Sequence, residues 1–188
     1  MRKKPQELFH LAKAALVKAG AHEAMAHTAA QHLVLAEEQG LSTHGMSRVP
    51  FYCSMLRNGR ADGGARPSMV SDRAAVCLID NADGLPYESC ALAIEEVMER
   101  ARRYGIGFAG IRNSAHVGVL GIHLLKVAAA GLVGVAFTNS PAAIPAWGGK
   151  KALFGTDPVA FAFPRKNADP IVIDLALSVA ARGKIMAA

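Results

Sequence analysis

Hydrophobic side chains recur with a helical period through the first third of the chain. Apolar residues spaced three and four apart between positions 6 and 20 would line one face of a helix, and Gly20 would end it. The same spacing predicts a helix over about 22–39, before Gly40, and a third from the segment after His44 to Gly59. The pattern therefore predicts a three-helix block at the N-terminus.

The pattern changes near residue 70, where short apolar runs begin to alternate with helical stretches. The expected strands are residues 74–80, 106–111, 132–137, 159–163 and 171–174, and the expected helices between them are 88–103 and 117–130. Such alternation is typical of α/β architecture. We therefore predict an α/β fold with an N-terminal helical block over residues 1–70 and an α/β block over 71–188. The second block looks incomplete, because helical sequence runs to Ala188 without a cap.

Composition limits the functional classes. The chain is 52% hydrophobic and 19% charged, as in a folded globular protein, and carries a formal net charge of +6. Its arginines are not interleaved with aromatic residues, and no nucleic-acid-binding signature is present, so the excess charge favours solvated surface first and small anionic ligands second. Nucleic acid is not expected as a partner.

Cysteine usage and hydropathy indicate a cytoplasmic protein. The three cysteines are odd in number and form no Cys-x-x-Cys pair, which favours reduced thiols, and no His or Cys pair has the spacing of a zinc site. The longest apolar run, residues 127–137, is far shorter than the ~20 residues of a membrane span. We expect no metal and no membrane contact.

One glycine motif has the letters of a dinucleotide-binding fingerprint. Residues 105–110 read Gly-Ile-Gly-Phe-Ala-Gly. The fingerprint requires a preceding strand and a following helix, so that the helix N-terminus meets the pyrophosphate. Here the predicted order is reversed, so Gly105 is better explained as a helix end and the Rossmann interpretation is rejected.

The strongest chemical pattern is the run Ser42-Thr43-His44-Gly45-Met46-Ser47-Arg48. On a helix, His44 and Arg48 would share one face. The imidazole can exchange a proton near neutral pH, and the guanidinium can hold a carboxylate with two hydrogen bonds. This pair suits an enzyme that acts on a small 2-oxo or 2-hydroxy acid; the alternative is a capped helix start with two solvated side chains.

Three later loops carry further candidates. His116 lies in the loop 112–118 between a strand and a helix, beside the predicted helix N-terminus, where backbone N–H groups suit a polar or anionic ligand. Small polar residues 138–140 follow a strand, residues 155–158 can approach a ligand closely, and Asp174 ends the last strand. The alternatives are a surface histidine, ordinary turn residues and a helix N-cap.

Together these segments resemble the type-2 malate/L-lactate dehydrogenases, a family that includes ureidoglycolate dehydrogenase, diketogulonate reductase, sulfolactate dehydrogenase and the piperideine-2-carboxylate reductases. The matching segments are residues 42–45 with Arg48, 112–118, 138–140, 155–164, and 174–176 with 183–184. Each motif is weak alone, but their order and spacing over nearly the whole chain make the set specific. The resemblance implies a non-Rossmann, mixed-sheet α/β fold, NAD or NADP as cofactor, a small carboxylate-bearing metabolite as substrate and a homodimer.

The resemblance also implies residue roles. His44 would exchange the proton with the substrate, although His116 has that role in some relatives, and Asp174 would tune the histidine. Arg48 would hold the substrate carboxylate, with Thr43 beside it. The residues implied in cofactor binding are His116, Asn139, Ser140, Thr156, Asp174, Leu175 and Ala176.

Some positions depart from the family pattern. Thr43 replaces a common Ser, Asp157 an Asn, and residues 85–86 a Gly-Gln pair. Family chains are also markedly longer, so a chain ending at Ala188 would have an incomplete cofactor site. The alternative function is therefore a truncated, non-catalytic module that binds a ligand or serves in assembly. The substrate, and the choice between NAD and NADP, stay open at this point.

Overall fold

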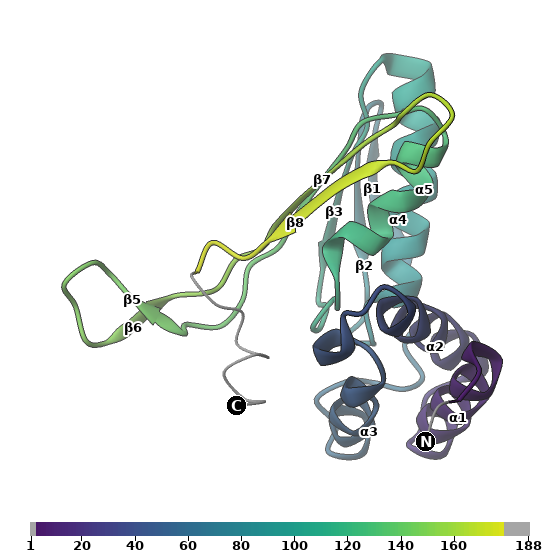
Figure 1. Ribbon diagram of the computed structural model, residues 1–188, viewed down its shortest axis with the longest axis vertical. Helices are drawn as coiled ribbons and strands as arrows, with labels where there is room; N and C mark the ends of the chain where they lie inside the picture. The colour runs from purple at the N-terminus through teal and green to yellow at the C-terminus, as the bar shows by residue number, and fades with distance from the viewer. Residues whose placement is uncertain (1–2, 179–188) are drawn as a thin grey trace. The chain divides into compact units, whose positions relative to one another are not determined.

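The computed structural model describes residues 3–178 of the chain (Figure 1). Its contacts divide the chain into two compact units, Met1–Gly118 and Val119–Ala188. The change from helices to strands near residue 70 lies inside the first unit, because the long helix α4 (Tyr87–Tyr104) packs against both the N-terminal helices and the strands.

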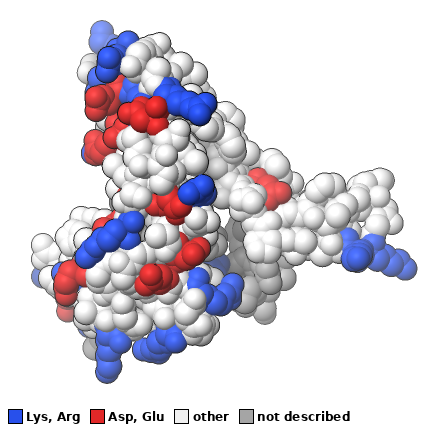
Figure 2. Space-filling view, turned by 180° about the vertical axis from the view of Figure 1, so that it is seen from behind, with Lys and Arg blue, Asp and Glu red and all other residues white. Residues whose placement is uncertain are grey.

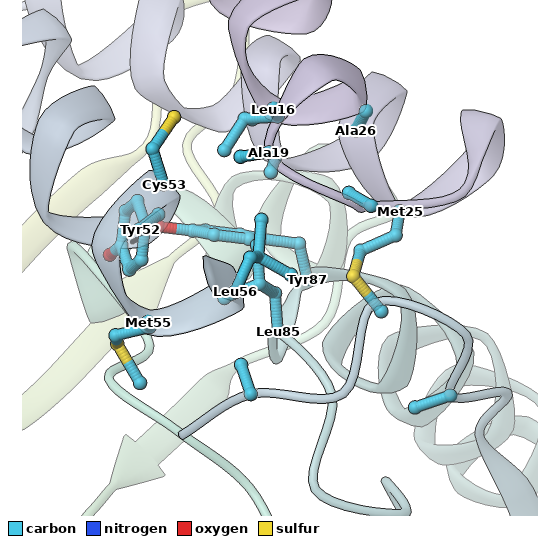
Figure 3. Close-up of a cluster of buried hydrophobic side chains, with 14 of the residues drawn as sticks. Leu16, Ala19, Met25, Ala26, Tyr52, Cys53, Met55, Leu56, Leu85 and Tyr87 are labelled. Atoms are coloured by element: carbon cyan, nitrogen blue, oxygen red, sulfur yellow. Dashed lines mark hydrogen bonds between the residues drawn. The ribbon is translucent and has the colours of Figure 1, made fainter. Parts of the chain in front are cut away.

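The predicted N-terminal helices are present. They are α1 (Pro5–Lys18), α2 (Glu23–Glu38) and α3 (Val49–Arg57). His22 precedes α2, and its Nδ1 accepts a hydrogen bond from the backbone N–H of Met25 at 3.3 Å, which satisfies one donor of the first turn. Buried side chains from these helices and from residues 85–87 around the start of α4 form one core, which includes Leu33. Figure 3 shows its members Leu16, Met25, Tyr52, Leu56, Leu85 and Tyr87.

The first unit also contains a three-stranded sheet in the order β1-β2-β3. Its strands are β1 (Ser68–Arg73), β2 (Val76–Asp80) and β3 (Phe108–Arg112). β1 and β2 pair antiparallel, while β3 runs parallel to β2 because α4 provides the crossover between them. The strand predicted over 74–80 is therefore the second arm of a hairpin, whose first arm the hydrophobic pattern missed.

The connection from α4 to β3 explains the glycine motif. Gly105 ends α4 in the left-handed conformation with φ +83°. A Cβ built on Gly107 would lie 2.9 Å from the Cα of Val97 in α4, and nearer still to its carbonyl oxygen. The rejection of a Rossmann fingerprint is thus confirmed, since helix precedes and strand follows.

The second unit places one helix against an antiparallel sheet. The helix is α5 (Leu120–Ala129), and the sheet order is β4 (Gly134–Phe137), β7 (Val159–Phe163), β8 (Ile171–Leu175). A two-stranded hairpin of β5 (Ile144–Pro145) and β6 (Ala152–Phe154), which the sequence did not predict, extends from this sheet (Figure 1). The expected start of this helix at residue 117 is wrong, because α5 begins at Leu120 and Val119 occupies the cap position without a side-chain hydrogen bond.

Charge distribution, cysteine state and side-chain clustering can be compared with the expectations from composition. On the face drawn in Figure 2, acidic and basic side chains are interspersed. All three cysteines are buried free thiols. Within residues 3–178, no helix combines the length and apolar character needed to cross a bilayer, and no cluster of side chains has the composition of a metal site.

Candidate active site

The segment that carries His44 and Arg48 is not one regular helix. It forms two 3-10 turns, Ser42–His44 and Met46–Arg48, separated at Gly45, which has ψ −134°. The prediction of a shared helix face is therefore wrong. The Glu37 carboxylate from α2 accepts the backbone N–H of Met46 at 2.9 Å and packs where a side chain at Gly45 would lie. This contact fixes the segment against α2 and explains the glycine.

The side chain of Arg48 is oriented by a nearby backbone carbonyl and an aromatic ring. Its Nε donates to the carbonyl oxygen of Thr43 at 2.6 Å, and its guanidinium carbon lies 5.9 Å from the ring centroid of Phe51. The Thr43 hydroxyl in turn lies 3.0 Å from Nδ1 of His44. This hydrogen bond uses Nε, and the terminal nitrogens of the guanidinium are the atoms that can bind a carboxylate with two hydrogen bonds.

His116 joins these residues from a segment far along the chain. Its ring stacks on the ring of His44 at a centroid distance of 5.8 Å and an interplanar angle of 21°. The structure thus brings the two histidines together, and Arg48 and His44 both act electrostatically on His116. Burial first, and then these two neighbours, lower the pKa of His116 to about 4, so this ring is neutral at pH 7.

Two tyrosines complete the cluster, and the sequence reasoning missed both. The Tyr52 hydroxyl lies 2.8 Å from Nδ1 of His116, and the Tyr87 hydroxyl donates to Tyr52 at 2.7 Å. Figure 3 shows the Tyr87 hydroxyl pointing toward Tyr52 inside the core. Burial raises the pKa of Tyr52 to about 12 and that of Tyr87 well above its usual value, so both keep their protons. The available signal was the spacing of Tyr52, four positions after Arg48.

In the second unit, the structure brings together Ser140 and Thr156, two of the residues implied in cofactor binding. The Ser140 Oγ accepts the backbone N–H of Thr156 at 2.8 Å, and the Ser140 N–H donates to Asp157 Oδ1 at 2.8 Å. The unusual Asp157 therefore holds the Ser140 loop in place. Asn139, next to Ser140, is exposed.

Asp174 binds a helix start. Its Oδ2 accepts the backbone N–H of Gly121 at 2.7 Å in the first turn of α5, an arrangement that compensates the positive end of the helix. Its predicted influence on His44 stays a prediction. Leu175, which follows in the chain, is 46% exposed, and residues 183–184 lie outside the described residues.

The chemical groups of these second-unit side chains are of the types that bind a nucleotide cofactor. Hydroxyls of Ser140 and Thr156, the exposed amide of Asn139 and the Asp174 carboxylate are partners suited to sugar hydroxyls and a carboxamide. The exposed apolar surface of Leu175 suits a flat ring.

Comparison with known proteins gives one family. The family model described as malate/L-lactate dehydrogenase matches residues 4–188. The chain is 43% identical over 185 residues to a (2R)-3-sulfolactate dehydrogenase (NADP(+)) of Chromohalobacter salexigens, covering 97% of this chain and 55% of that protein. It is 36% identical over 182 residues to a Delta(1)-pyrroline-2-carboxylate/Delta(1)-piperideine-2-carboxylate reductase of Pseudomonas putida, covering 97% and 53%.

A solved structure agrees with these relatives. The sulfolactate dehydrogenase of Methanocaldococcus jannaschii superposes with a TM-score of 0.91 at 30% identity, covering 100% of this chain and 54% of that one. The predicted α/β fold of this type is therefore confirmed. The chain spans about half the length of the curated relatives it matches, 55% and 53% of the two named above.

Proposed function

Because the chain belongs to the malate/L-lactate dehydrogenase family, we propose that it serves hydride transfer between NAD or NADP and a small 2-hydroxy or 2-oxo acid, or a cyclic imino acid. The observation that carries the proposal is the cluster of His44, Arg48 and His116 in the first unit. The names of the relatives support it, since they include dehydrogenases of sulfolactate and a reductase of cyclic imino acids.

Each residue of the cluster has a distinct task. Arg48 binds the substrate carboxylate, because its Nε is held by the Thr43 carbonyl and its terminal nitrogens form a two-pronged donor. This single anchor sets the position of the reacting carbon and its oxygen or nitrogen. The substrates named for the relatives all carry a carboxylate beside that carbon, so one anchor serves all of them.

His44 and His116 divide the work on the reacting oxygen or nitrogen. His116, with a pKa of about 4, stays neutral at pH 7 and acts as a hydrogen-bond donor there, not as a source of a proton. His44 takes the proton from a 2-hydroxy acid during oxidation and returns it during reduction. The Thr43 hydroxyl beside Nδ1 of His44 helps to orient that ring.

The second unit supplies the cofactor contacts in this proposal. Asn139, Ser140, Thr156 and the segment 174–176 would hold the nicotinamide dinucleotide. When bound, the nicotinamide supplies or accepts the hydride.

The rival interpretation, a non-catalytic ligand-binding or assembly module, receives no support from the comparisons, which favour the dehydrogenase. The homodimer and the absence of nucleic-acid partners stay predictions, and light scattering of the purified protein would measure the first. The coenzyme preference follows from titration with NADH and NADPH.

The proposal is tested by coenzyme turnover with (2R)-3-sulfolactate, malate, lactate, ureidoglycolate and Δ1-piperideine-2-carboxylate. We expect turnover of at least one of them with NAD(H) or NADP(H). His44→Ala should lower kcat by about 10²–10⁴-fold, the usual contribution of general acid–base catalysis, and should leave coenzyme binding intact.

The matched control is His27→Ala, which removes an exposed histidine from α2 and should leave kcat unchanged. A wild-type protein that turns over none of the five compounds would rule the proposal out. Equal loss of kcat in both variants would remove His44 from the mechanism.

A further inference from the structure

The hydrogen bonds around His116 define which nitrogen of its ring carries the proton. We propose that Tyr52, supported by Tyr87, is a positioning residue that holds His116 as the neutral tautomer protonated on Nε2. This inference rests on the proposed function for its catalytic meaning, but its structural content is independent of turnover.

The first step concerns Nδ1 of His116. The backbone N–H of Gly118 donates to this atom at 3.3 Å, and a backbone amide can only donate. Nδ1 must therefore present a lone pair. A neutral imidazole has one donor and one acceptor nitrogen, so the proton resides on Nε2.

The second step fixes the direction of the Tyr52 hydrogen bond. Because Nδ1 is an acceptor, the Tyr52 hydroxyl 2.8 Å away can only donate to it. The carbonyl oxygen of His116 is a second, more distant acceptor for the same hydroxyl, at 3.3 Å. The Tyr87 hydroxyl donates to Tyr52 at 2.7 Å, which occupies a lone pair of Tyr52 and leaves its hydrogen for His116. The chain of donors runs from Tyr87 through Tyr52 to the imidazole, and each bond polarises the next.

Burial makes this arrangement rigid. Tyr52 is 0% and Tyr87 3% exposed, so water does not compete for their hydroxyls. The rings pack edge to face, with centroids 5.8 Å apart. Gly118 keeps the space open, since a Cβ at that position would lie 3.0 Å from the Tyr87 hydroxyl.

The consequence for the reaction depends on which nitrogen of the His116 ring donates a hydrogen bond. With Nδ1 fixed as the acceptor, Nε2–H is the group that His116 offers to a substrate oxygen or nitrogen. Arg48, His44 and Tyr52 face His116, and the charges of Arg48 and His44 oppose a second proton on its ring. His116 thus remains a donor of one hydrogen bond.

The test is long-range ¹H–¹⁵N correlation on protein labelled with [¹⁵N]histidine, with His116 assigned from a His116→Gln sample. In the wild type at pH 7 we expect the pattern of an Nε2-protonated neutral ring. Tyr52→Phe should give a mixture of both tautomers, and Tyr87→Phe a smaller change in the same direction. The matched control Tyr104→Phe, at the exposed end of α4, should change nothing.

Kinetics provide the second readout. Tyr52→Phe should lower kcat by about tenfold to a hundredfold, part of the ~10²–10⁴ that acid–base groups contribute, with KM within about twofold. A wild-type ring protonated on Nδ1 overturns the proposal without any variant. An unchanged tautomer in a folded Tyr52→Phe protein overturns it as well. The protein could also show the Nε2-protonated ring and its response to Tyr52→Phe while turning over no substrate. That result would support the tautomer proposal and would contradict only the dehydrogenase function.

Discussion

At the scale of single residues, the site depends on how each polar side chain is held by its neighbours. Arg48 illustrates this, because the Thr43 carbonyl occupies its Nε and the Phe51 ring lies beside its guanidinium. The side chain is therefore ordered before a ligand arrives, and binding has less rotamer entropy to lose. A lysine at this position would lack both Nε and the planar fork.

Arg48→Lys should raise KM for the 2-oxo or 2-hydroxy acid about tenfold or more, because one ammonium replaces a two-pronged donor to the carboxylate. Binding of NADH or NADPH should be unaffected. The measurement is steady-state kinetics together with nicotinamide fluorescence. Arg57→Lys, which changes an exposed arginine in the last turn of α3, should leave KM as it is. A KM that responds equally to both changes would contradict the assigned role.

Candidate residues could be named from the sequence where they lie in one segment, whereas contacts between two distant segments were not predicted. His44 and Arg48 stand close together in the sequence, so they were expected to act as a pair, although the regular helix expected to carry both is replaced by two 3-10 turns. The hydrogen bond from Tyr52 to His116 spans 64 residues, and that between Ser140 and Thr156 spans 16. Only folding brings such partners together, so the sequence offered His116 as a candidate but not the tyrosine that contacts it.

At the scale of elements, hydrophobic periodicity predicted the long helices, each of which buries one face, and missed the exposed strand β1. α2 and α4 bury regular stripes, and both were found. β1 is largely exposed and mixes polar with apolar side chains, so its pattern resembles a loop. The turn around Gly45 was wrongly expected to be helical, because its geometry comes from the Glu37 carboxylate on another helix.

The close approach of α4 and β3 makes a prediction at this scale. Gly107→Ala should lower the free energy of unfolding by about 2–3 kcal/mol or more, because the new Cβ would overlap the backbone of Val97 and the two elements must separate. Gly110→Ala is the matched control from the same glycine motif. Its Cβ would lie 3.2 Å from Cδ1 of Leu78, a flexible side-chain end, so we expect a loss under about 1 kcal/mol.

Urea unfolding of the two variants measures the difference. Equal losses of unfolding free energy in the two variants would show that the close contact with the α4 backbone is not the reason for a glycine at position 107. A larger loss for Gly107→Ala would also establish packing as the reason for this glycine, in agreement with the reversed order of helix and strand around residues 105–110.

At the scale of the whole molecule, titration couples the site to the stability of the first unit. Asp72 and Asp80 have pKa values below their ordinary 3.8, Asp72 mainly through its hydrogen bond with Arg100 and Asp80 mainly through the backbone N–H of Ala82. The stability that these carboxylates contribute is lost only below that pH. Protonation of His116 affects the stability of the first unit over a separate, higher pH range.

Acid should therefore weaken the first unit at a pH above that at which Asp72 and Asp80 titrate. The folded pKa of His116, about 4, lies below its ordinary 6.5, so the unfolded chain binds the extra proton first. The contribution is complete above pH 6.5 and is lost as the pH falls toward 4. At pH 5 the free energy of unfolding should be about 1–2 kcal/mol lower than at pH 7, after allowance for solvent around a half-buried ring. Urea titrations at the two pH values measure this, with His116→Gln expected to flatten the dependence and His10→Gln, an exposed position on α1, expected to retain it. A dependence that survives in His116→Gln would assign the acid sensitivity to another group.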